Sequence, residues 1–284
     1  MLQGLEVYQM SIGNKLIIKA GKTEERYWKD IWQYRELFYF LSWRDILVRY
    51  KQTVIGIAWS IIRPLLTMII LTIVFGKMAK LPSDGVPYPL LVFSAMLPWQ
   101  FFSNALSTAS GSIVNNANLI SKIYFPRLII PTSAVVTSFI DFLISGIILA
   151  VFMVWYQFIP GWRILSLPIF IAIAFASAMG VSLWITALNV KYRDFFHIIP
   201  FIVQFGLYIS PVGFSSSIVP DKWRLLYSIN PMVGVIDGFR WALLGGNSAI
   251  YWPGFLLSIS IVGIVLLTGI IYFRKTEKTF ADII

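Results

Sequence analysis

Hydrophobic and polar positions follow a helical spacing in residues 34–52. The apolar positions recur at steps of three and four, at Phe40, Trp43, Leu47, Tyr50 and Val54. The polar positions recur at the same steps, at Ser42, Asp45, Arg49 and Gln52, with Arg44 and Lys51 at the border. This pattern predicts an amphipathic helix in the membrane interface, with its cationic side facing anionic headgroups or a cytosolic partner.

Long apolar runs follow this helix without a linker. Each has about 20 residues, the length that a bilayer core of about 30 Å requires. They predict membrane spans at residues 54–75, 88–113, 129–156, 165–188, 197–214 and 251–273. We therefore expect an all-α, polytopic membrane protein with a cytosolic N-terminal region (1–33), a transmembrane domain (34–273) and a cytosolic tail (274–284). No cleavable signal peptide is expected, because a charged segment precedes the first span.

The composition agrees with a membrane protein. Hydrophobic residues make up 58% of the 284 residues and charged residues 13%, whereas soluble domains have roughly 45–50% and about 25%. The chain has no cysteine, which excludes disulfides and thiolate metal sites. The formal charge of +10 is more typical of topology signals than of nucleic-acid binding, so no nucleic-acid partner is expected.

Lys and Arg residues near the span ends favour one orientation. With the N-terminus inside, the cytoplasmic set is Arg35, Arg44, Arg49, Lys51, Lys122, Arg127, Lys191, Arg193, Arg274, Lys275 and Lys278. The opposite set is Lys77, Lys80, Arg163, Lys222, Arg224 and Arg240. The first set is the larger, so the positive-inside rule predicts that both termini are cytoplasmic.

The second predicted span is the least apolar. Small and hydroxylated residues fill its later half, from Ser103 to Ser112. Such residues let helices approach closely. They also suit the lining of a polar path, and the sequence leaves both interpretations open.

Residues 215–247 form neither a simple loop nor a full span. Asp221 is suited as the N-cap of a short helix (222–229), Asn230-Pro231 breaks that helix, and a second one (232–244) follows. Their aromatic residues suit interfacial depth; these are Trp223, Tyr227, Phe239 and Trp241. The pair predicts a re-entrant hairpin, which is either a gate or a packed external cap.

Two charged residues lie inside predicted spans. Arg63 stands next to Pro64, and an arginine at the bilayer centre costs about 2.5–3.5 kcal/mol. It either snorkels to the headgroups or faces a cavity, where its guanidinium would suit a phosphate or pyrophosphate. Asp141 is the only acid in the predicted spans. It is protonated, bonded to Ser138 or Ser145, or paired with Arg63.

Neither catalysis nor nucleotide binding is indicated for this chain. His197 is the only histidine, and no other candidate catalytic groups cluster with it in the sequence. Gly21-Lys22-Thr23 imitates the end of a P-loop, but Leu16 stands where the pattern requires glycine. We therefore expect a protein that is not an enzyme by itself and that binds no metal and no ATP.

Six runs along the chain resemble, in order, the permease subunit of type-2 ABC exporters. They are RDILVRYKQTVIGIAWSIIRPL (44–65), FSAMLPWQFFSNAL (93–106), NLISKIYFPRLIIP (118–131), LNVKYRDF (188–195), ISPVGFS (209–215) and INPMVGVIDGFRWALLG (229–245). The resemblance covers residues 34 to about 273. It is strongest to the polysaccharide branch, which exports O-antigen, capsule or teichoic acid.

The resemblance implies a homodimer of six-helix subunits in the bacterial inner membrane. Each subunit would sit on a separate ATPase that binds ATP and Mg. It assigns residues 34–52 as an interface helix, 118–127 as a coupling helix, 188–195 as a second ATPase contact and 222–245 as gate helices. The implied coupling residues are Asn118, Ser121, Lys122, Tyr124, Arg127, Tyr192, Arg193 and Asp194. The implied gate residues are Trp223, Tyr227, Pro231, Phe239, Arg240 and Trp241.

The implied substrate is a glycan on an undecaprenyl-type lipid pyrophosphate, with O-antigen preferred over capsule or teichoic acid. We expect four cations to receive its pyrophosphate at the inner mouth: Arg63, Arg44, Arg49 and Lys51. Two rival functions remain. An ion-coupled secondary transporter would need more intramembrane acids, and a membrane enzyme acting on lipid-linked sugars would need convergent catalytic groups.

Overall fold

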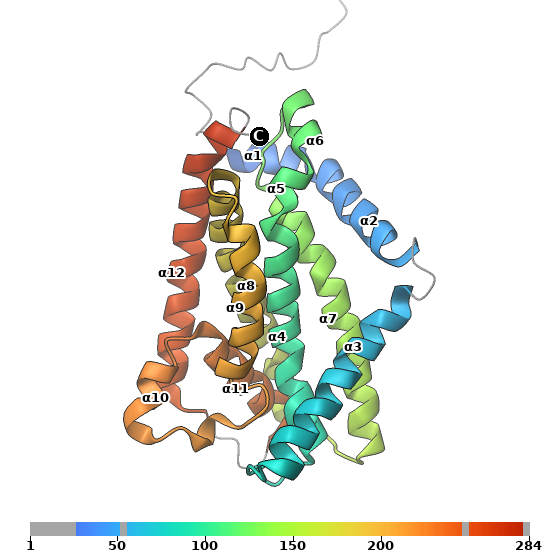
Figure 1. The fold of residues 1–284 in the computed structure, drawn as a ribbon, viewed down its shortest axis with the longest axis vertical. Coiled ribbons are helices and arrows are strands. Elements are labelled where there is room, and N and C mark those ends of the chain that lie inside the picture. Colours follow the sequence, from blue (N-terminus) through green and yellow to red (C-terminus); the bar gives the residue numbers. More distant parts are fainter. Residues whose placement is uncertain (1–26, 52–55, 246–249, 281–284) are drawn as a thin grey trace, which may run out of the picture.

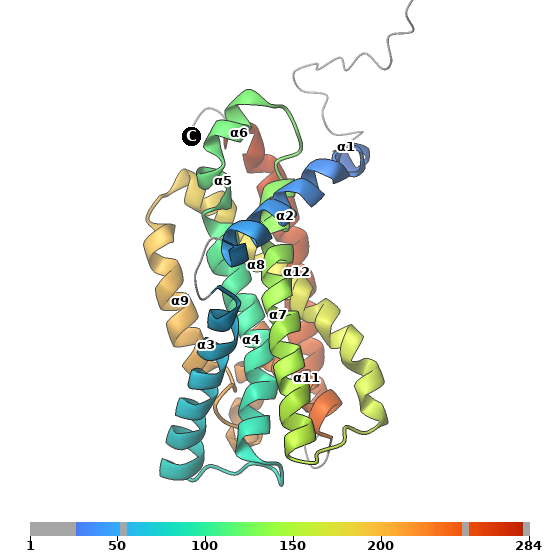
Figure 2. The ribbon, with the colours of Figure 1, turned by 90° about the vertical axis from the view of Figure 1, so that its right-hand side faces the viewer.

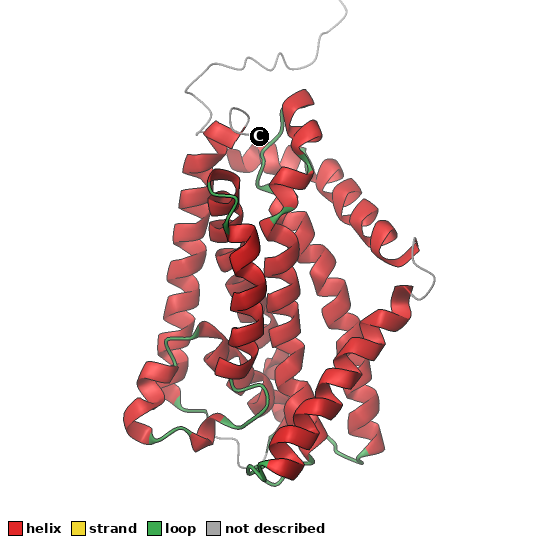
Figure 3. Cartoon of the chain, viewed as in Figure 1, coloured by secondary structure: helices red, strands yellow, loops and turns green. Residues whose placement is uncertain are grey.

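The computed structural model describes residues 27–51, 56–245 and 250–280, and every regular element in this part is a helix (Figure 3). The all-α prediction is confirmed. The longest helices run along the long axis of the molecule (Figure 1). The Gly21-Lys22-Thr23 run lies outside the described residues.

Four stretches of described helix are long and apolar enough to cross a membrane. They are Ala58–Met78, Ile129–Trp155, Trp162–Lys191 and Trp252–Thr279. Their elements are α3 (Gly56–Leu71) with the π-helix η1 (Thr72–Met78), α7 (Ile129–Trp155), η2 (Trp162–Ser166) with α8 (Leu167–Lys191), and α12 (Trp252–Thr276) with η4 (Glu277–Thr279). They overlap the first, third, fourth and sixth predicted spans.

Helix α4 (Tyr88–Ser110) corresponds to the second predicted span and contacts α3, α7, α8, α9 and α11. It lies in the middle of the bundle (Figure 1). Because protein surrounds much of α4, it can carry more polar residues than a helix that faces lipid. Its buried hydroxyls donate to the preceding turn, as Ser94 does to the Leu91 carbonyl at 3.0 Å. Close helix packing is therefore the role of its buried serines.

Helix α9 (Phe195–Ile209) is shorter than the predicted span 197–214. Its 15 residues measure about 22 Å, whereas a bilayer core is about 30 Å thick. The helix ends because Pro211 follows Ser210, whose ψ is 152°, and a residue before proline avoids the helical conformation. The predicted helix end at 214 is wrong, and residues 210–214 are irregular.

Helices α8 and α12 make backbone contact at two glycines. A Cβ atom on Gly180 would lie 2.8 Å from the Cα of Leu266, and one on Gly269 would lie 2.7 Å from the Gly180 carbonyl oxygen. Backbone atoms cannot rotate aside as a side chain can. Glycine at both positions therefore permits the close packing of these two helices.

Short helices mark the two ends of the bundle (Figure 1). Helices α1 (Tyr27–Gln33), α5 (Ser112–Asn115) and α6 (Ala117–Lys122) lie at one end, here called the α6 end, where the described residues also end after η4. Helices α10 (Asp221–Tyr227) and α11 (Pro231–Leu244) lie at the other, the α11 end, near the 3-10 turn η3 (Ser216–Ile218).

Helix α2 (Arg35–Lys51) starts at the α6 end and packs against α7 (Figure 2). It confirms the helix predicted over residues 34–52 as far as Lys51, whereas Gln52 and Val54 lie outside the described residues. The coupling helix implied for 118–127 is shorter than expected. It ends at Lys122, and Ile123 is extended (φ −131°, ψ 136°). Pro126 disfavours helical backbone at Phe125.

Candidate functional site

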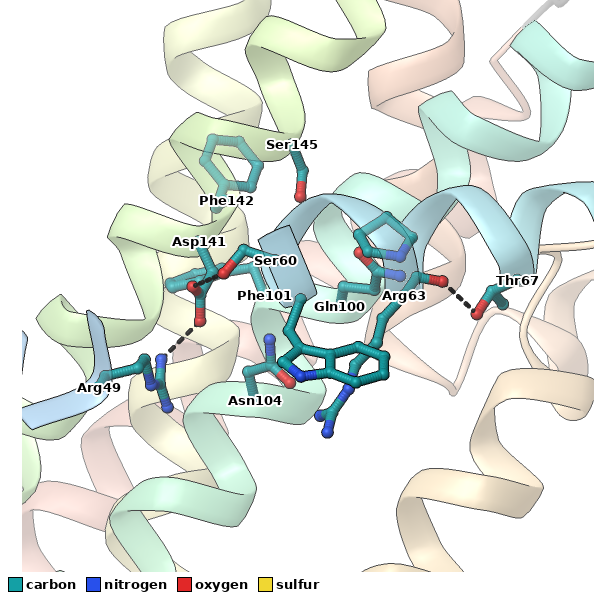
Figure 4. A pocket seen from close by; sticks show the side chains of 12 residues that line it. Arg49, Ser60, Arg63, Thr67, Gln100, Phe101, Asn104, Asp141, Phe142 and Ser145 are labelled. Carbon is teal, nitrogen blue, oxygen red and sulfur yellow. Dashed lines mark hydrogen bonds and ion pairs between the residues drawn. The ribbon is translucent and has the colours of Figure 1, made fainter. Parts of the chain in front are cut away.

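A polar cavity of about 420 Å³ lies between α2, α3, α4 and α7 (Figure 4). Each of these helices contributes at least one charged or amide side chain or hydroxyl. The lining residues are Arg49, Trp59, Ser60, Arg63, Pro64, Thr67, Gln100, Phe101, Asn104, Asp141, Phe142 and Ser145. Three of these helices, α3, α4 and α7, belong to the long helices of the bundle, so the cavity is a polar site within the bundle.

Asp141 on α7 organises one side of the cavity. Arg49 and Tyr50, at the end of α2, donate to its two carboxylate oxygens. Ser60 of α3 lies 3.4 Å from the same carboxylate. The Asp141 side chain is only 16% exposed, and a carboxylate at that depth requires a charged or hydrogen-bonded partner. The ion pair between Arg49 and Asp141 joins the last turn of α2 to the middle of α7.

The partner of Asp141 differs from the one considered in the sequence. Arg63 was the expected cation, and Ser138 or Ser145 were the alternative hydrogen-bond donors. Instead Ser138 donates to the Ala134 carbonyl at 3.1 Å, and Arg49 forms the ion pair. The physical reason is the tilt of α2 across α7, which brings its last turn to the level of Asp141.

The two faces of α2 meet different surroundings. Phe40, Trp43 and Leu47 are exposed to the outside of the bundle, as expected for the apolar face. The polar face turns toward α7, where Ser42 is buried and Arg49 is paired. Tyr50 was placed on the apolar face and instead hydrogen-bonds within the cavity.

Arg63 is exposed and lies over the ring of Trp59, with its guanidinium carbon 5.6 Å from the ring centroid. Figure 4 shows the Arg63 side chain running from α3 toward Asn104, separate from the contact between Arg49 and Asp141. Among the described residues no carboxylate lies within ion-pair distance of Arg63. Arg63 therefore faces the cavity with a positive charge that no acid of the described chain neutralises.

Helix α4 supplies the amides of the cavity. Gln100 and Asn104, one helical turn apart, line it, and Thr108 follows on the same face, 3.4 Å from Arg49. Close packing and the lining of a polar path thus apply to different faces of α4. Its buried serines lie where it packs against other helices, and the face with Gln100 and Asn104 borders the cavity. In the sequence, the i, i+4, i+8 spacing of Gln100, Asn104 and Thr108 indicates this polar face of α4.

The four expected pyrophosphate cations separate into two pairs. Arg49 and Arg63 line the cavity. Arg44 binds Asp45 at 2.8 Å and the Asn116 side chain at 3.1 Å. It lies with Lys51 along a shallow groove on the outer, apolar side of α2.

The implied coupling residues lie at the α6 end and at the α8–α9 connection. Seven of them are exposed: Asn118, Ser121, Lys122, Tyr124, Tyr192, Arg193 and Asp194. Arg127 is half-buried and donates to the Glu277 backbone carbonyl. His197 is exposed, and the described residues contain no cluster of metal-binding side chains.

The implied gate residues divide into exposed and buried ones. Trp223 is 53% exposed, whereas Phe239 is fully buried. Tyr227 donates to the Ile209 carbonyl at 2.8 Å. Pro231 and Trp241 are half-buried. Helix α11 packs against α4, α8 and α12, which accounts for the burial of its inner side.

Arg240 of α11 is buried, with 3% exposure, although the sequence placed it among the external cations. Its guanidinium donates to the carbonyls of Val212 (3.1 Å), Phe214 (2.8 Å) and Leu91 (3.2 Å). The first two belong to the irregular segment after α9 (residues 210–214). Arg240 satisfies these carbonyls and holds the segment inside the bundle.

The N-cap of α10 also differs from the prediction. The helix begins at Asp221 itself, after Pro220, and no side chain caps it. Asp221 instead lies 3.5 Å from Arg224, three residues on. Asn230, expected only as a helix breaker, caps α11 by accepting from the Met232 amide at 3.0 Å.

Comparisons with known proteins relate this chain to a family of transporters. The family model of ABC-2 type transporters matches residues 36–244. O-antigen export system permease protein RfbA of Myxococcus xanthus is 26% identical over 89% of this chain and 97% of its own length. RfbA of Klebsiella pneumoniae is 27% identical over 88% and 95%. Polysialic acid transport protein KpsM of Escherichia coli is 22% identical over 72% and 79%. Every residue that lines the cavity falls inside the matched range.

Proposed function

The chain belongs to the ABC-2 type transporter family, and from this premise we propose that it is the permease subunit of an ATP-driven exporter of a lipid-linked polysaccharide. The names of its relatives support a polysaccharide, since RfbA is an O-antigen export permease and KpsM a polysialic acid transport protein. We take O-antigen on undecaprenyl pyrophosphate as the substrate. Capsule and teichoic acid precursors are the alternatives.

ATP hydrolysis takes place on a separate partner in this proposal, which binds ATP and Mg. The incomplete P-loop pattern before Gly21, with Leu16 in place of glycine, supports a separate ATPase. The permease works as a homodimer in the bacterial inner membrane, with both termini cytoplasmic. The exposed side chains at 118–124 and 192–194 support docking of the ATPase at the α6 end.

The observation that carries the substrate proposal is the cavity beside Arg63. A guanidinium without an acidic partner matches the oxygens of a pyrophosphate, and Gln100 and Asn104 add amide donors on the same cavity wall. Arg49 is held by Asp141. A movement of α2, driven by the ATPase, would release Arg49 from Asp141 toward the pyrophosphate and so connect hydrolysis with substrate passage.

Replacement of Arg63 tests this proposal. The Arg63→Ala variant should abolish export while the permease still assembles with its ATPase, and Arg63→Lys should retain part of the activity because it keeps the charge. The measurements are surface polysaccharide on cells and ATPase co-purification. Lys77→Ala, which removes an exposed cation of η1 outside the cavity, is the matched control. Normal surface polysaccharide in Arg63→Ala cells would overturn the substrate proposal.

Co-purification also separates this function from its rivals. A secondary transporter or a membrane enzyme would be isolated without a stoichiometric ATPase. Asp141 is the only acid in the predicted spans and is paired with Arg49, whereas an ion-coupled transporter needs several intramembrane acids.

A further inference from the structure

A second cavity, of about 700 Å³, lies at the α6 end of the bundle. Helix α1, the segment after α6, and the end of α12 with η4 enclose it. Its lining residues are Tyr27, Asp30, Tyr124, Phe125, Pro126, Arg127, Ile271, Arg274, Lys275, Glu277 and Lys278. None of them lines the first cavity, which contains Arg63 and is called the Arg63 cavity from here on. The second cavity is therefore a separate site.

Basic residues outnumber acidic ones around this cavity. Arg127, Arg274, Lys275 and Lys278 face it, against Asp30 and Glu277. Within the described chain, no ion pair joins Arg127, Arg274 or Lys275 to a carboxylate. The Glu277 carboxylate interacts electrostatically with Arg127, Arg274 and Lys278, and the four cations against two carboxylates leave the cavity wall with a net positive charge.

The side chains of the wall are held in place by one another. Tyr27 donates to the Glu277 carboxylate at 3.0 Å, and burial raises the pKa of its phenol, which stays protonated and able to donate. The Arg274 guanidinium lies over the Tyr27 ring, 4.6 Å from its centroid. Stacking engages the flat face of the guanidinium and leaves the N–H groups at its edge for a ligand.

An apolar stripe leads along α12 to the same cavity. Ile264, Leu267 and Ile271 are 60%, 63% and 65% exposed, and their spacing of three and four residues places them on one face of the helix. Ile271 also lines the cavity. The stripe is about 10 Å long and is apolar, which suits the part of an acyl chain next to a headgroup, and it ends where Arg274 and Lys275 begin the basic wall.

We propose that this cavity binds the phosphate headgroup of an anionic phospholipid, with an acyl chain along the Ile264–Leu267–Ile271 stripe. Basic pockets at the membrane surface of transmembrane proteins suit such headgroups. An acidic peptide would match the cations equally well, but it would not account for the continuity with the lipid-facing stripe. The ligand chemistry is a phosphate ester, which can come from a lipid or from a soluble compound.

The test measures binding of fluorescent phosphatidylglycerol and phosphatidylcholine to the full chain in uncharged detergent. The wild-type chain should prefer phosphatidylglycerol. The Arg274→Gln/Lys275→Gln variant should bind it about 25-fold more weakly, since each cation near an anionic surface contributes about fivefold. Arg274→Lys should keep most of the preference, because the charge remains.

The matched control is Lys29→Gln/Arg35→Gln, which removes two exposed cations at the same end that do not line the cavity. It should leave the affinity within about twofold, which is the effect of a mean surface charge alone. Equal affinity of the wild-type chain for both lipids, or equal losses in the two double variants, would overturn the proposal. Displacement of bound lipid by excess glycerol 3-phosphate would reassign the site to a soluble phosphate. Displacement by the purified ATPase would reassign it to a protein interface.

Discussion

Asp141 receives hydrogen bonds from Arg49 and Tyr50. These contacts join residues that are about 90 positions apart in the chain. The sequence identified Asp141 and Arg49 as separate features, because each stands out locally. Their pairing could not be predicted, since it depends on how α2 tilts across α7. Tyr50 was assigned to the wrong face for the same reason, because one helical position decides whether a side chain meets lipid or Asp141.

Removal of the Asp141 charge should destabilise the junction of α2 and α7. The Asp141→Asn variant leaves the Arg49 guanidinium half-buried without its counter-ion, and we expect a loss of about 1–3 kcal/mol in unfolding free energy. The measurement is thermal unfolding in detergent. Arg49→Gln/Asp141→Asn should recover part of the loss, because it removes both charges together. Additive losses in the double variant would mean that the two residues do not interact.

The helices were predicted to within a few residues wherever the apolar pattern was continuous. The third predicted span, 129–156, corresponds to Ile129–Trp155. The predicted end of the fifth span was wrong at Ser210-Pro211, because hydropathy does not report backbone conformation, although Pro64 and Pro98 lie inside helices as predicted. The helix predicted over residues 232–244 is present as α11 (Pro231–Leu244), whereas its burial depends on contacts with α4, α8 and α12 and could not be predicted from its own composition.

The contact between α8 and α12 should tolerate no side chain at Gly180. Gly180→Val places its Cβ against the Leu266 backbone, so the helices must separate, at a cost of about 1–3 kcal/mol. Gly263→Val on α12 is the control, since a Cβ there would meet nothing within 4 Å. The lowering of the melting temperature should be confined to Gly180→Val. Equal shifts in both variants would show that the cost comes from the loss of glycine itself.

At the scale of the whole molecule, the α6 end and the Arg63 cavity are connected through α2. The same helix begins beside α1 (Figure 1), and Arg49 and Tyr50 in its last turn contact Asp141. A force applied by a partner at the α6 end would therefore reach the cavity through one element. The sequence predicted an interface helix that runs into the first span without a linker, whereas the contact of that helix with Asp141 of α7 required the fold.

Charge reversal on the exposed docking segments should disconnect the partner without harming the permease. We expect Lys122→Glu/Arg193→Glu to reduce co-purified ATPase by about tenfold or more, since like-charge contacts at an interface are strongly unfavourable. The melting temperature of the permease should stay unchanged, because both side chains are exposed. Lys222→Glu, on an exposed cation at the α11 end, should retain the ATPase. Full retention of ATPase by the double variant would contradict docking at these segments.

The short helix α9 has a consequence for the bilayer itself. At about 22 Å it is some 8 Å shorter than an average hydrocarbon core, and Phe201 and Phe205 are exposed along it. Where lipid meets this side of the protein, local thinning of the bilayer is one way to relieve the hydrophobic mismatch, besides snorkelling of flanking side chains and oligomerisation. In a thinner bilayer a polar headgroup has a shorter distance to cross. The membrane next to α9 would therefore favour the passage of an amphiphile.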